Sequence, residues 1–276
     1  MKKNLQAIAF LALAITFCNQ ALAIEILAHR GASGEYPQGT ALAFDMALEQ
    51  GADILEMDVH LSKDHYIIIN HDADLKDNAG VPDKIEDLTL SEIKVLDAGY
   101  KFTLDGGKSY PFRSQGLTLI TLNEIFERYP DGVFNIEIKP NDKTLSEVLW
   151  QVISDYRMEQ QVTVASQHSK AMNHFRDISY GGVRTSASIG ELIEASLAWS
   201  SGFGWAFRPK FDVAQLPYGI TTKPYVRFFQ KKGVIVDLWT VNDEEHIERS
   251  ISLGVDGIIG DYPDRIYRAL VDAGER

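Results

Sequence analysis

The stretch Gly51-Ala52-Asp53-Ile54-Leu55-Glu56-Met57-Asp58-Val59-His60 decides the fold. The residues before it, Thr40–Gln50, have the apolar spacing of a helix, and Gly51 stands where such a helix should stop. In Asp53–His60 apolar and polar side chains then alternate, which is typical of a strand. A helix that leads at once into a strand indicates a sheet of parallel strands.

The same alternation of helix and strand continues along the chain. Short runs rich in Val, Ile and Leu predict strands at Ile24–His29, Asp53–His60, Tyr66–His71, Val133–Lys139, Val162–Ser166, Val183–Ser188, Gly204–Phe207, Val234–Val241 and Asp256–Gly260. Helical spacing predicts helices at Thr40–Gln50, Thr89–Leu96, Thr121–Tyr129, Lys143–Met158, Ser169–Asp177, Ile189–Ser200, Lys223–Lys232, Asn242–Leu253 and Pro263–Ala273. So many alternations predict an α/β fold closed into a TIM (β/α)8 barrel.

Nine strands are predicted, one more than the eight of such a barrel. Only five residues separate Asp53–His60 from Tyr66–His71, too few for the crossover between two parallel strands. Tyr66–His71 is therefore predicted to be the return arm of a hairpin above the barrel mouth. The following stretch, about residues 72–118, fits no barrel repeat, and we expect it to form a small inserted cap subdomain.

Residues 1–23 have the layout of a secretory signal peptide. Lys2 and Lys3 precede the apolar run Ala7–Phe17, and Ala21-Leu22-Ala23 resembles a cleavage site. The apolar run is shorter than the about 20 residues that span a bilayer. We therefore expect an exported protein, periplasmic or secreted, with no stable membrane anchor; the alternative is an uncleaved anchor.

Cleavage after Ala23 would leave residues 24–276, the usual length of one α/β barrel. It would remove Cys18, the only cysteine, and with it any disulfide or thiol chemistry. Loss of two lysines would also change the net charge from −12 to −14. So acidic a protein repels nucleic acid, which excludes that class of partner, and any site for a small anion must be made locally positive.

Polar residues gather at the carboxyl ends of the predicted barrel strands, where barrel enzymes keep their active sites. The first strand ends in His29-Arg30-Gly31. Histidine can transfer a proton near neutral pH, and arginine presents a planar fork of donors to phosphate. The alternative is a surface histidine beside a solvated arginine.

Glu56 and Asp58 share one face of the second strand, because side chains alternate along a strand. Leu55, Met57 and Val59 occupy the other face and should point toward the helices. Two carboxylates aimed at one spot repel each other and lose hydration, and a cation such as Mg²⁺ or Ca²⁺ resolves both problems. The alternative is an edge strand with a solvated acidic face.

The hairpin arm and the next barrel strand add three candidates. His71 would complete an acid–base pair with His29. Glu137 and Lys139 share one face of the strand Val133–Lys139, so that Glu137 could be a third oxygen ligand and Lys139 a phosphate contact. The alternative for these two residues is a structural ion pair inside the barrel.

The charges of these residues favour a single site. Glu56, Asp58 and Glu137 contribute −3, and Arg30 and Lys139 contribute +2. A divalent cation would change the local sum from −1 to +1, which is enough to hold a phosphate monoanion in an acidic protein. Later in the chain, Trp239 is either an apolar wall of this site or a core residue.

Together these segments resemble the glycerophosphodiester phosphodiesterase family. The matching segments, in family order along the mature chain, are Ala28-His29-Arg30-Gly31-Ala32-Ser33-Gly34, Gly51–Val59, His71-Asp72, Ile136-Glu137-Ile138-Lys139, Trp239-Thr240-Val241-Asn242 and Gly254–Ile259. The combination is specific to this family, although no single segment is.

The resemblance implies a TIM barrel with an inserted cap, one divalent cation, and a small phosphodiester as substrate. It assigns His29 and His71 to acid–base catalysis and Arg30, Lys139 and Trp239 to substrate binding. The metal ligands that it implies are Glu56, Asp58 and Glu137. The products would be glycerol 3-phosphate and an alcohol, formed either by direct attack of water or through a cyclic phosphate.

The chain departs from the family pattern at three places. Pro37-Gln38-Gly39-Thr40 stands where the family usually has Pro-Glu-Asn-Thr, Gly260 replaces a frequent threonine, and Asp77-Asn78 replaces arginine-threonine. These departures affect the expected substrate more than the reaction type. Two alternatives stay open: a phospholipase of the lysophospholipase D type that acts on membrane lipid, and a non-catalytic phosphate-binding barrel.

Overall fold

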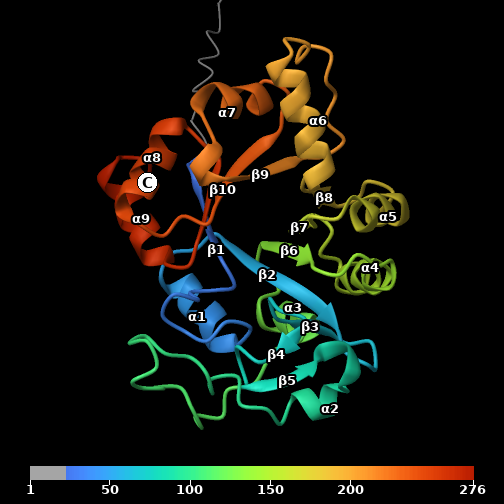
Figure 1. Cartoon of the computed structure of the whole chain (residues 1–276), viewed down its shortest axis with the longest axis vertical. Helices are drawn as coiled ribbons and strands as arrows, with labels where there is room; N and C mark the ends of the chain where they lie inside the picture. Colours follow the sequence, from blue (N-terminus) through green and yellow to red (C-terminus); the bar gives the residue numbers. More distant parts are fainter. Residues whose placement is uncertain (1–22) are drawn as a thin grey trace, which may run out of the picture.

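Eight parallel strands form a nearly closed barrel in a computed structural model of the chain, which describes residues 23–276 (Figure 1). Around the sheet the strands are β8 (Arg184–Thr185), β7 (Val162–Ala165), β6 (Phe134–Ile138), β2 (Ile54–Leu61), β1 (Glu25–Ala28), β11 (Gly257–Gly260), β10 (Ile235–Trp239) and β9 (Val213–Pro217). An isolated parallel bridge between Ser186 and Val213 brings the two ends of the sheet together. The predicted TIM barrel is confirmed.

Helices follow the strands and cover the outside of the barrel (Figure 1). They are α1 (Ala41–Glu49), α3 (Leu122–Arg128), α4 (Thr144–Tyr156), α5 (Ser169–Ser179), α6 (Ile189–Ser200), α7 (Lys223–Gln230), α8 (Glu244–Leu253) and α9 (Pro263–Asp272). Leu55, Met57 and Val59 of β2 are buried in one apolar cluster with Phe44 of α1. Because strand side chains alternate, this packing turns the acidic face of β2 into the barrel.

The predicted strand Gly204–Phe207 is wrong, and β9 (Val213–Pro217) takes its place. Trp205 is 74% exposed, whereas the apolar side chains of β9 are buried. Two residues make the strand pattern of β9 hard to recognise in the sequence. Gln215 interrupts its apolar pattern because the side chain donates to Asn135 Oδ1 across the barrel (3.0 Å), and Pro217 is tolerated at the end of the strand.

The predicted hairpin is confirmed, because β3 (Ile67–Ile69) pairs with β2 in antiparallel fashion. After it, β4 (Asp74–Leu75) and β5 (Val81–Lys84) form a second small sheet, followed by α2 (Leu90–Ile93). This segment packs around an apolar cluster of its own, which includes Leu75, Ile85 and Ile93. It lies beside the loop that follows β1.

The expected leader lies outside the described residues except for Ala23. Among residues 23–276, no helix combines the length and the apolar character needed to cross a bilayer.

Candidate active site

His29 and Arg30 leave β1 in a sharp turn at the barrel mouth. Arg30 and Gly31 both have positive φ angles, 58° and 80°. A side chain at Gly31 would place its Cβ 2.6 Å from the carbonyl oxygen of Ala43, so only glycine fits between this loop and α1. The sequence segment His-Arg-Gly therefore encodes a turn that directs the two preceding side chains into the mouth.

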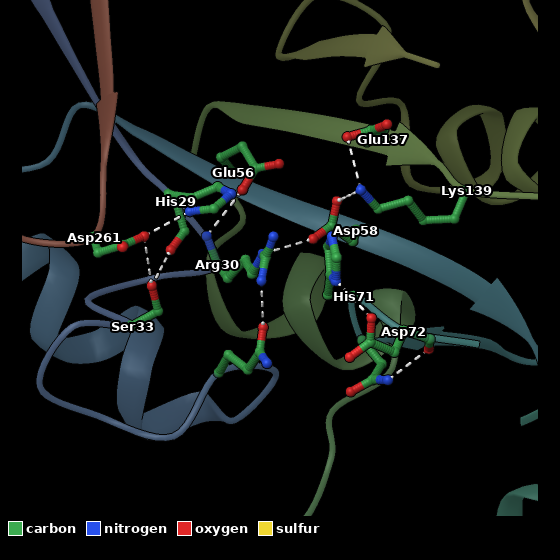
Figure 2. A network of polar contacts seen from close by, with 12 residues as sticks. His29, Arg30, Ser33, Glu56, Asp58, His71, Asp72, Glu137, Lys139 and Asp261 are labelled. Carbon is green, nitrogen blue, oxygen red and sulfur yellow. Dashed lines mark hydrogen bonds and ion pairs between the residues drawn. The ribbon is translucent and has the colours of Figure 1, made fainter. Parts of the chain in front are cut away.

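Three carboxylates from two neighbouring strands converge inside the barrel (Figure 2). Asp58 of β2 is paired in register with Glu137 of β6, and Glu56 lies two residues before Asp58. One oxygen from each of the three lies within 4.8 Å of the others. Glu56 and Asp58 are only 4% and 2% exposed, and β2 lies between β1 and β6, so the alternative of a solvated edge strand is excluded.

Two cations share the central carboxylate of this acidic cluster. The Arg30 Nε atom lies 2.9 Å from Asp58 Oδ2, and Lys139 Nζ lies 2.8 Å from Asp58 Oδ1. Lys139 also contacts Glu137 at 3.0 Å, so the ion pair expected as an alternative is present within the site. Glu56 accepts a hydrogen bond from the Arg30 backbone N–H at 2.9 Å.

The acidic cluster keeps an oxygen that lacks a good partner. Asp58 Oδ2 is buried and makes no aligned hydrogen bond, despite its ion contact with Arg30. Buried polar atoms are otherwise almost always satisfied. A divalent cation takes oxygen ligands of this kind, so the donor set of Glu56, Asp58 and Glu137 fits one.

The pKa values of the three carboxylates are driven apart by their surroundings. Burial, and next the charge of Asp58, raises the pKa of Glu56 to about 7, and burial also raises the pKa of Glu137. Burial opposes ionisation of Asp58 too, but Lys139 and Arg30 outweigh it and hold the pKa of Asp58 below its usual range. Glu56 therefore takes up a proton as the pH falls through about 7, and a bound cation would displace that proton.

His29 is held by a network that the sequence analysis missed (Figure 2). Its Nδ1 lies 2.6 Å from Asp261 Oδ1, and Ser33 Oγ donates to the His29 carbonyl oxygen at 2.6 Å. Asn242 Nδ2 donates to Asp261 Oδ2 at 2.6 Å. Burial alone would lower the pKa of His29, but the hydrogen bond to Asp261 and the charge of Glu56 outweigh it and raise the pKa.

A signal for Asp261 was available in the sequence. It directly follows Gly260, the last residue of β11, and so lies at the carboxyl end of a barrel strand, where working residues are expected. Its pairing with His29, 232 positions earlier, comes from closure of the barrel between β1 and β11.

His71 follows the hairpin strand β3 and faces the same site (Figure 2). Its Nδ1 lies 2.8 Å from Asp72 Oδ1, and its carbonyl oxygen lies 3.1 Å from His60 Nε2. Burial and then the charge of Arg30 lower the pKa of His71. The two histidines thus have pKa values shifted in opposite directions, which is the pattern expected of an acid and a base.

A cavity of about 470 Å³ opens beside these residues. Its polar lining includes residues already described together with Ser166, Gln167, Ser186 and Ser196. Its apolar lining includes Ile189, Leu192, Ile193, Pro217, Ile220 and Trp239. Trp239 is 40% exposed, and its Nε1 donates to the Gln215 carbonyl oxygen at 3.2 Å. The structure therefore places Trp239 on the wall of the cavity and not in the core.

Comparison with known proteins gives a consistent result. Residues 29–265 match the model of the Glycerophosphoryl diester phosphodiesterase family. A glycerophosphodiester phosphodiesterase of Caldanaerobacter subterraneus is 33% identical over 90% of this chain and 98% of its own. A lysophospholipase D of Rattus norvegicus is 25% identical over 88% of this chain and 85% of its own. A phosphodiesterase of Oleispira antarctica, solved with the product sn-glycerol-3-phosphate, superimposes with a TM-score of 0.70 at 24% identity, covering 90% and 96% of the two chains.

Proposed function

Since the chain belongs to the glycerophosphoryl diester phosphodiesterase family and is a phosphodiesterase, we propose that it releases glycerol 3-phosphate and an alcohol from glycerophosphodiesters in a cation-dependent reaction. In this proposal His29 and His71 transfer the protons, and Glu56, Asp58 and Glu137 hold the cation. The leader-like pattern of residues 1–23 extends the proposal to a protein exported from the cytoplasm.

The observation that carries the proposal is the convergence of the three carboxylates beside Arg30 and Lys139. Without a cation the five formal charges sum to −1, or to 0 when Glu56 is protonated, so the site lacks the net positive charge that would attract a phosphodiester. Glu56, Asp58 and Glu137 would hold a divalent cation, which would supply positive charge to polarise a phosphoryl oxygen. Arg30 and Lys139 are already held in place by Asp58 and can turn donors toward the phosphate.

The two histidines divide the proton transfers according to their pKa values. His71, with its lowered pKa, is neutral near neutral pH and accepts a proton from the attacking oxygen. The pKa of His29 is raised, which favours the protonated ring, and in the proposal this ring donates from Nε2 to the leaving oxygen, because Nδ1 is engaged by Asp261. The two histidines have the same roles whether the attacking oxygen belongs to water or to the neighbouring glycerol hydroxyl.

Replacing Asp261 with asparagine should lower kcat by roughly 10² or more, because His29 would lose the partner that orients its ring. The same change should lower the pKa of His29 and so move the alkaline limb of the pH–rate profile to lower pH. Steady-state kinetics from pH 5 to 10 measure both effects. Asp264→Asn, which removes a carboxylate paired with Arg268 on the outside, is the matched control. A reduced kcat with an unmoved alkaline limb would show that Asp261 does not act through His29.

The direct test of the proposed function is to incubate the purified protein with glycerophosphocholine and assay glycerol 3-phosphate. Release of both products with Mg²⁺, Ca²⁺ or Mn²⁺ present supports the proposal. Binding of inorganic phosphate without turnover of the diester would instead support the alternative of a non-catalytic barrel.

The apolar side chains that line the cavity of about 470 Å³ favour a second candidate activity, that of a lysophospholipase D. Ile189, Ile193 and Ile220 are 50%, 55% and 79% exposed and line this cavity together with Trp239. Such a surface suits an acyl chain, and each buried methylene is worth about 0.8 kcal/mol, or roughly fourfold in kcat/KM. We expect lysophosphatidylcholines to be cleaved faster as the chain grows, up to a plateau. A rate independent of chain length would exclude this candidate.

A further inference from the structure

Large apolar side chains are exposed along α6 and in the loop that follows it. Ile189, Ile193 and Leu197 are spaced four residues apart, so they share one face of the helix. They are 50%, 55% and 64% exposed, and Phe203 and Trp205 in the loop are 65% and 74% exposed. Exposed apolar residues are normally scattered singly, whereas a group of them marks a surface that contacts a partner or a membrane.

Contacts with α7 join this group to a larger surface. Trp199 at the end of α6 packs on Tyr225 with ring centroids 5.0 Å apart, and Ser196 Oγ lies 2.7 Å from the Tyr225 hydroxyl. In the loop, Phe207 packs on Phe228 with ring centroids 6.0 Å apart. The helix α6, the loop and α7 therefore form one surface, here called the α6–α7 surface. It lies at the end of the molecule away from β4, β5 and α2 (Figure 1).

The α6–α7 surface is basic, although the chain as a whole is acidic. Residues 201–232 contain six basic residues and one acidic residue, a net charge of +5 in a chain of net charge −12. The acidic residue, Asp212, accepts a hydrogen bond from the Thr185 backbone N–H at 2.8 Å. On α6, Glu191 is paired with Arg176 and only Glu194 is exposed. Among residues 23–276 no carboxylate forms an ion pair with any of the six, which are Arg208, Lys210, Lys223, Arg227, Lys231 and Lys232.

These cations lie close to the exposed aromatic rings. Arg208 follows Trp205 by three residues, and its Nη1 donates to the Trp205 carbonyl oxygen at 2.8 Å. On α7, a shallow hollow of about 400 Å³ is lined by Arg227, Gln230 and Lys231. Exposed tryptophan combined with lysine and arginine is typical of protein surfaces at a membrane interface. There the rings lie among the lipid head groups and the cations meet the lipid phosphates.

We propose that the α6–α7 surface docks reversibly on a bilayer that contains anionic phospholipid. Phe203 and Trp205 enter the head-group region, and the six cations face the lipid phosphates. Because Ile189 and Ile193 also line the cavity of about 470 Å³, docking places one wall of that cavity against the lipid. A second copy of the chain fits this surface less well, since a two-fold contact would bring two positively charged surfaces together. The proposal rests on exposure and charge and not on the proposed reaction.

The first test measures how the purified protein partitions onto phosphatidylcholine vesicles with and without phosphatidylglycerol. The anionic lipid should raise the partition coefficient at least about tenfold, and added salt should cancel most of that gain because it screens the charges. Combining Arg208→Gln with Lys231→Gln should lower binding to the anionic vesicles about fivefold per charge removed. The matched control is Lys143→Gln with Lys170→Gln, which removes two exposed lysines near α4 and α5 and should leave binding unchanged.

The second test uses Trp205 as a local reporter. Brominated lipid should quench tryptophan fluorescence on binding, and Trp205→Phe should remove about half or more of the quenching, because phenylalanine keeps the ring but not the signal. Replacing Phe203 and Trp205 together with serine should lower the partition coefficient about tenfold or more. Val95→Ser, which replaces an apolar residue that is 82% exposed after α2, is the control.

Unchanged partition in both double variants of the α6–α7 surface, or quenching that Trp205→Phe does not reduce, would overturn the proposal. So would a dimer in vesicle-free solution that dissociates on replacement of Phe203 and Trp205, because a second copy would then be the occupant. All variants should hydrolyse soluble glycerophosphocholine at the unmodified rate, since the replaced residues lie outside the candidate active site. Failure of docking and failure of the proposed function are therefore distinguishable.

Discussion

Replacing His71 with alanine is expected to lower kcat for glycerophosphodiesters about 10²–10⁴-fold, the usual contribution of one acid or base. The fold should survive, because the His71 side chain is 35% exposed and its ring contacts only Asp72 among the hydrogen-bond partners described. Steady-state kinetics and thermal unfolding, measured on the same sample, separate the two effects. His65→Asn, on the hairpin turn, is the control for loss of an imidazole.

His29→Ala should reduce kcat by a similar factor, and the two variants should differ in their pH dependence. In the unmodified protein, protonation of His71 lowers the rate on the acid side, and deprotonation of His29 lowers it on the alkaline side. Since the pKa of His71 is lowered and that of His29 is raised, the plateau should extend on both sides of pH 6.5, the ordinary value for histidine. The pH–rate profile of the activity that remains in His71→Ala should no longer fall on the acid side. Near-normal turnover in either variant would remove that histidine from the mechanism.

Removal of the divalent cation should reduce the rate by about 10³-fold or more, because several kcal/mol of charge stabilisation would be lost. The experiment is dialysis against a chelator, followed by assay with Mg²⁺, Ca²⁺ and Mn²⁺ restored one at a time. Binding should also raise the free energy of unfolding, by about 2.7 kcal/mol at a concentration 100 times Kd. Full activity in chelator, with no effect of cations on unfolding, would contradict the cation site.

The affinity for the cation should depend on pH in a direction set by Glu56. Its pKa of about 7 means that a proton competes with the cation below neutral pH, so the affinity should fall about tenfold between pH 8 and pH 6. Titration calorimetry in buffers of different ionisation enthalpy measures the released proton. Glu137→Gln should weaken binding, whereas Glu49→Gln, at the end of α1, is the control. Unchanged affinity in Glu137→Gln would remove Glu137 from the ligand set.

The barrel and the acidic cluster could be predicted from the sequence because both depend on periodicity. Alternation along β2 places Glu56 and Asp58 on one face whatever the rest of the fold does. The strand Phe134–Ile138 does the same for Glu137 and Asn135. Once a parallel barrel is inferred, the inner faces of neighbouring strands must share one interior.

The features that were not predicted from the sequence are those in which a side chain bonds to a residue far away along the chain. β9 was missed because Gln215 breaks the apolar pattern to reach Asn135, 80 positions away. In the same way, Asp261 has no local pattern that marks it beyond its place after the last strand, although it bonds the His29 ring and contributes to the raised pKa of His29.

The sequence by itself determined the order of the elements, the inward face of each strand and the residue types at the barrel mouth, since these follow from local periodicity and turn chemistry. Only the tertiary structure decided that Asp58 is shared between Arg30 and Lys139, that Asp261 holds His29, and that His29 and Arg30 line two cavities. Asp261 reaches His29 because the first and last strands, β1 and β11, pair, and Asp58 meets both Arg30 and Lys139 because β2 lies between β1 and β6. The distances across the barrel mouth depend on this order of the strands in the sheet and not on any local pattern.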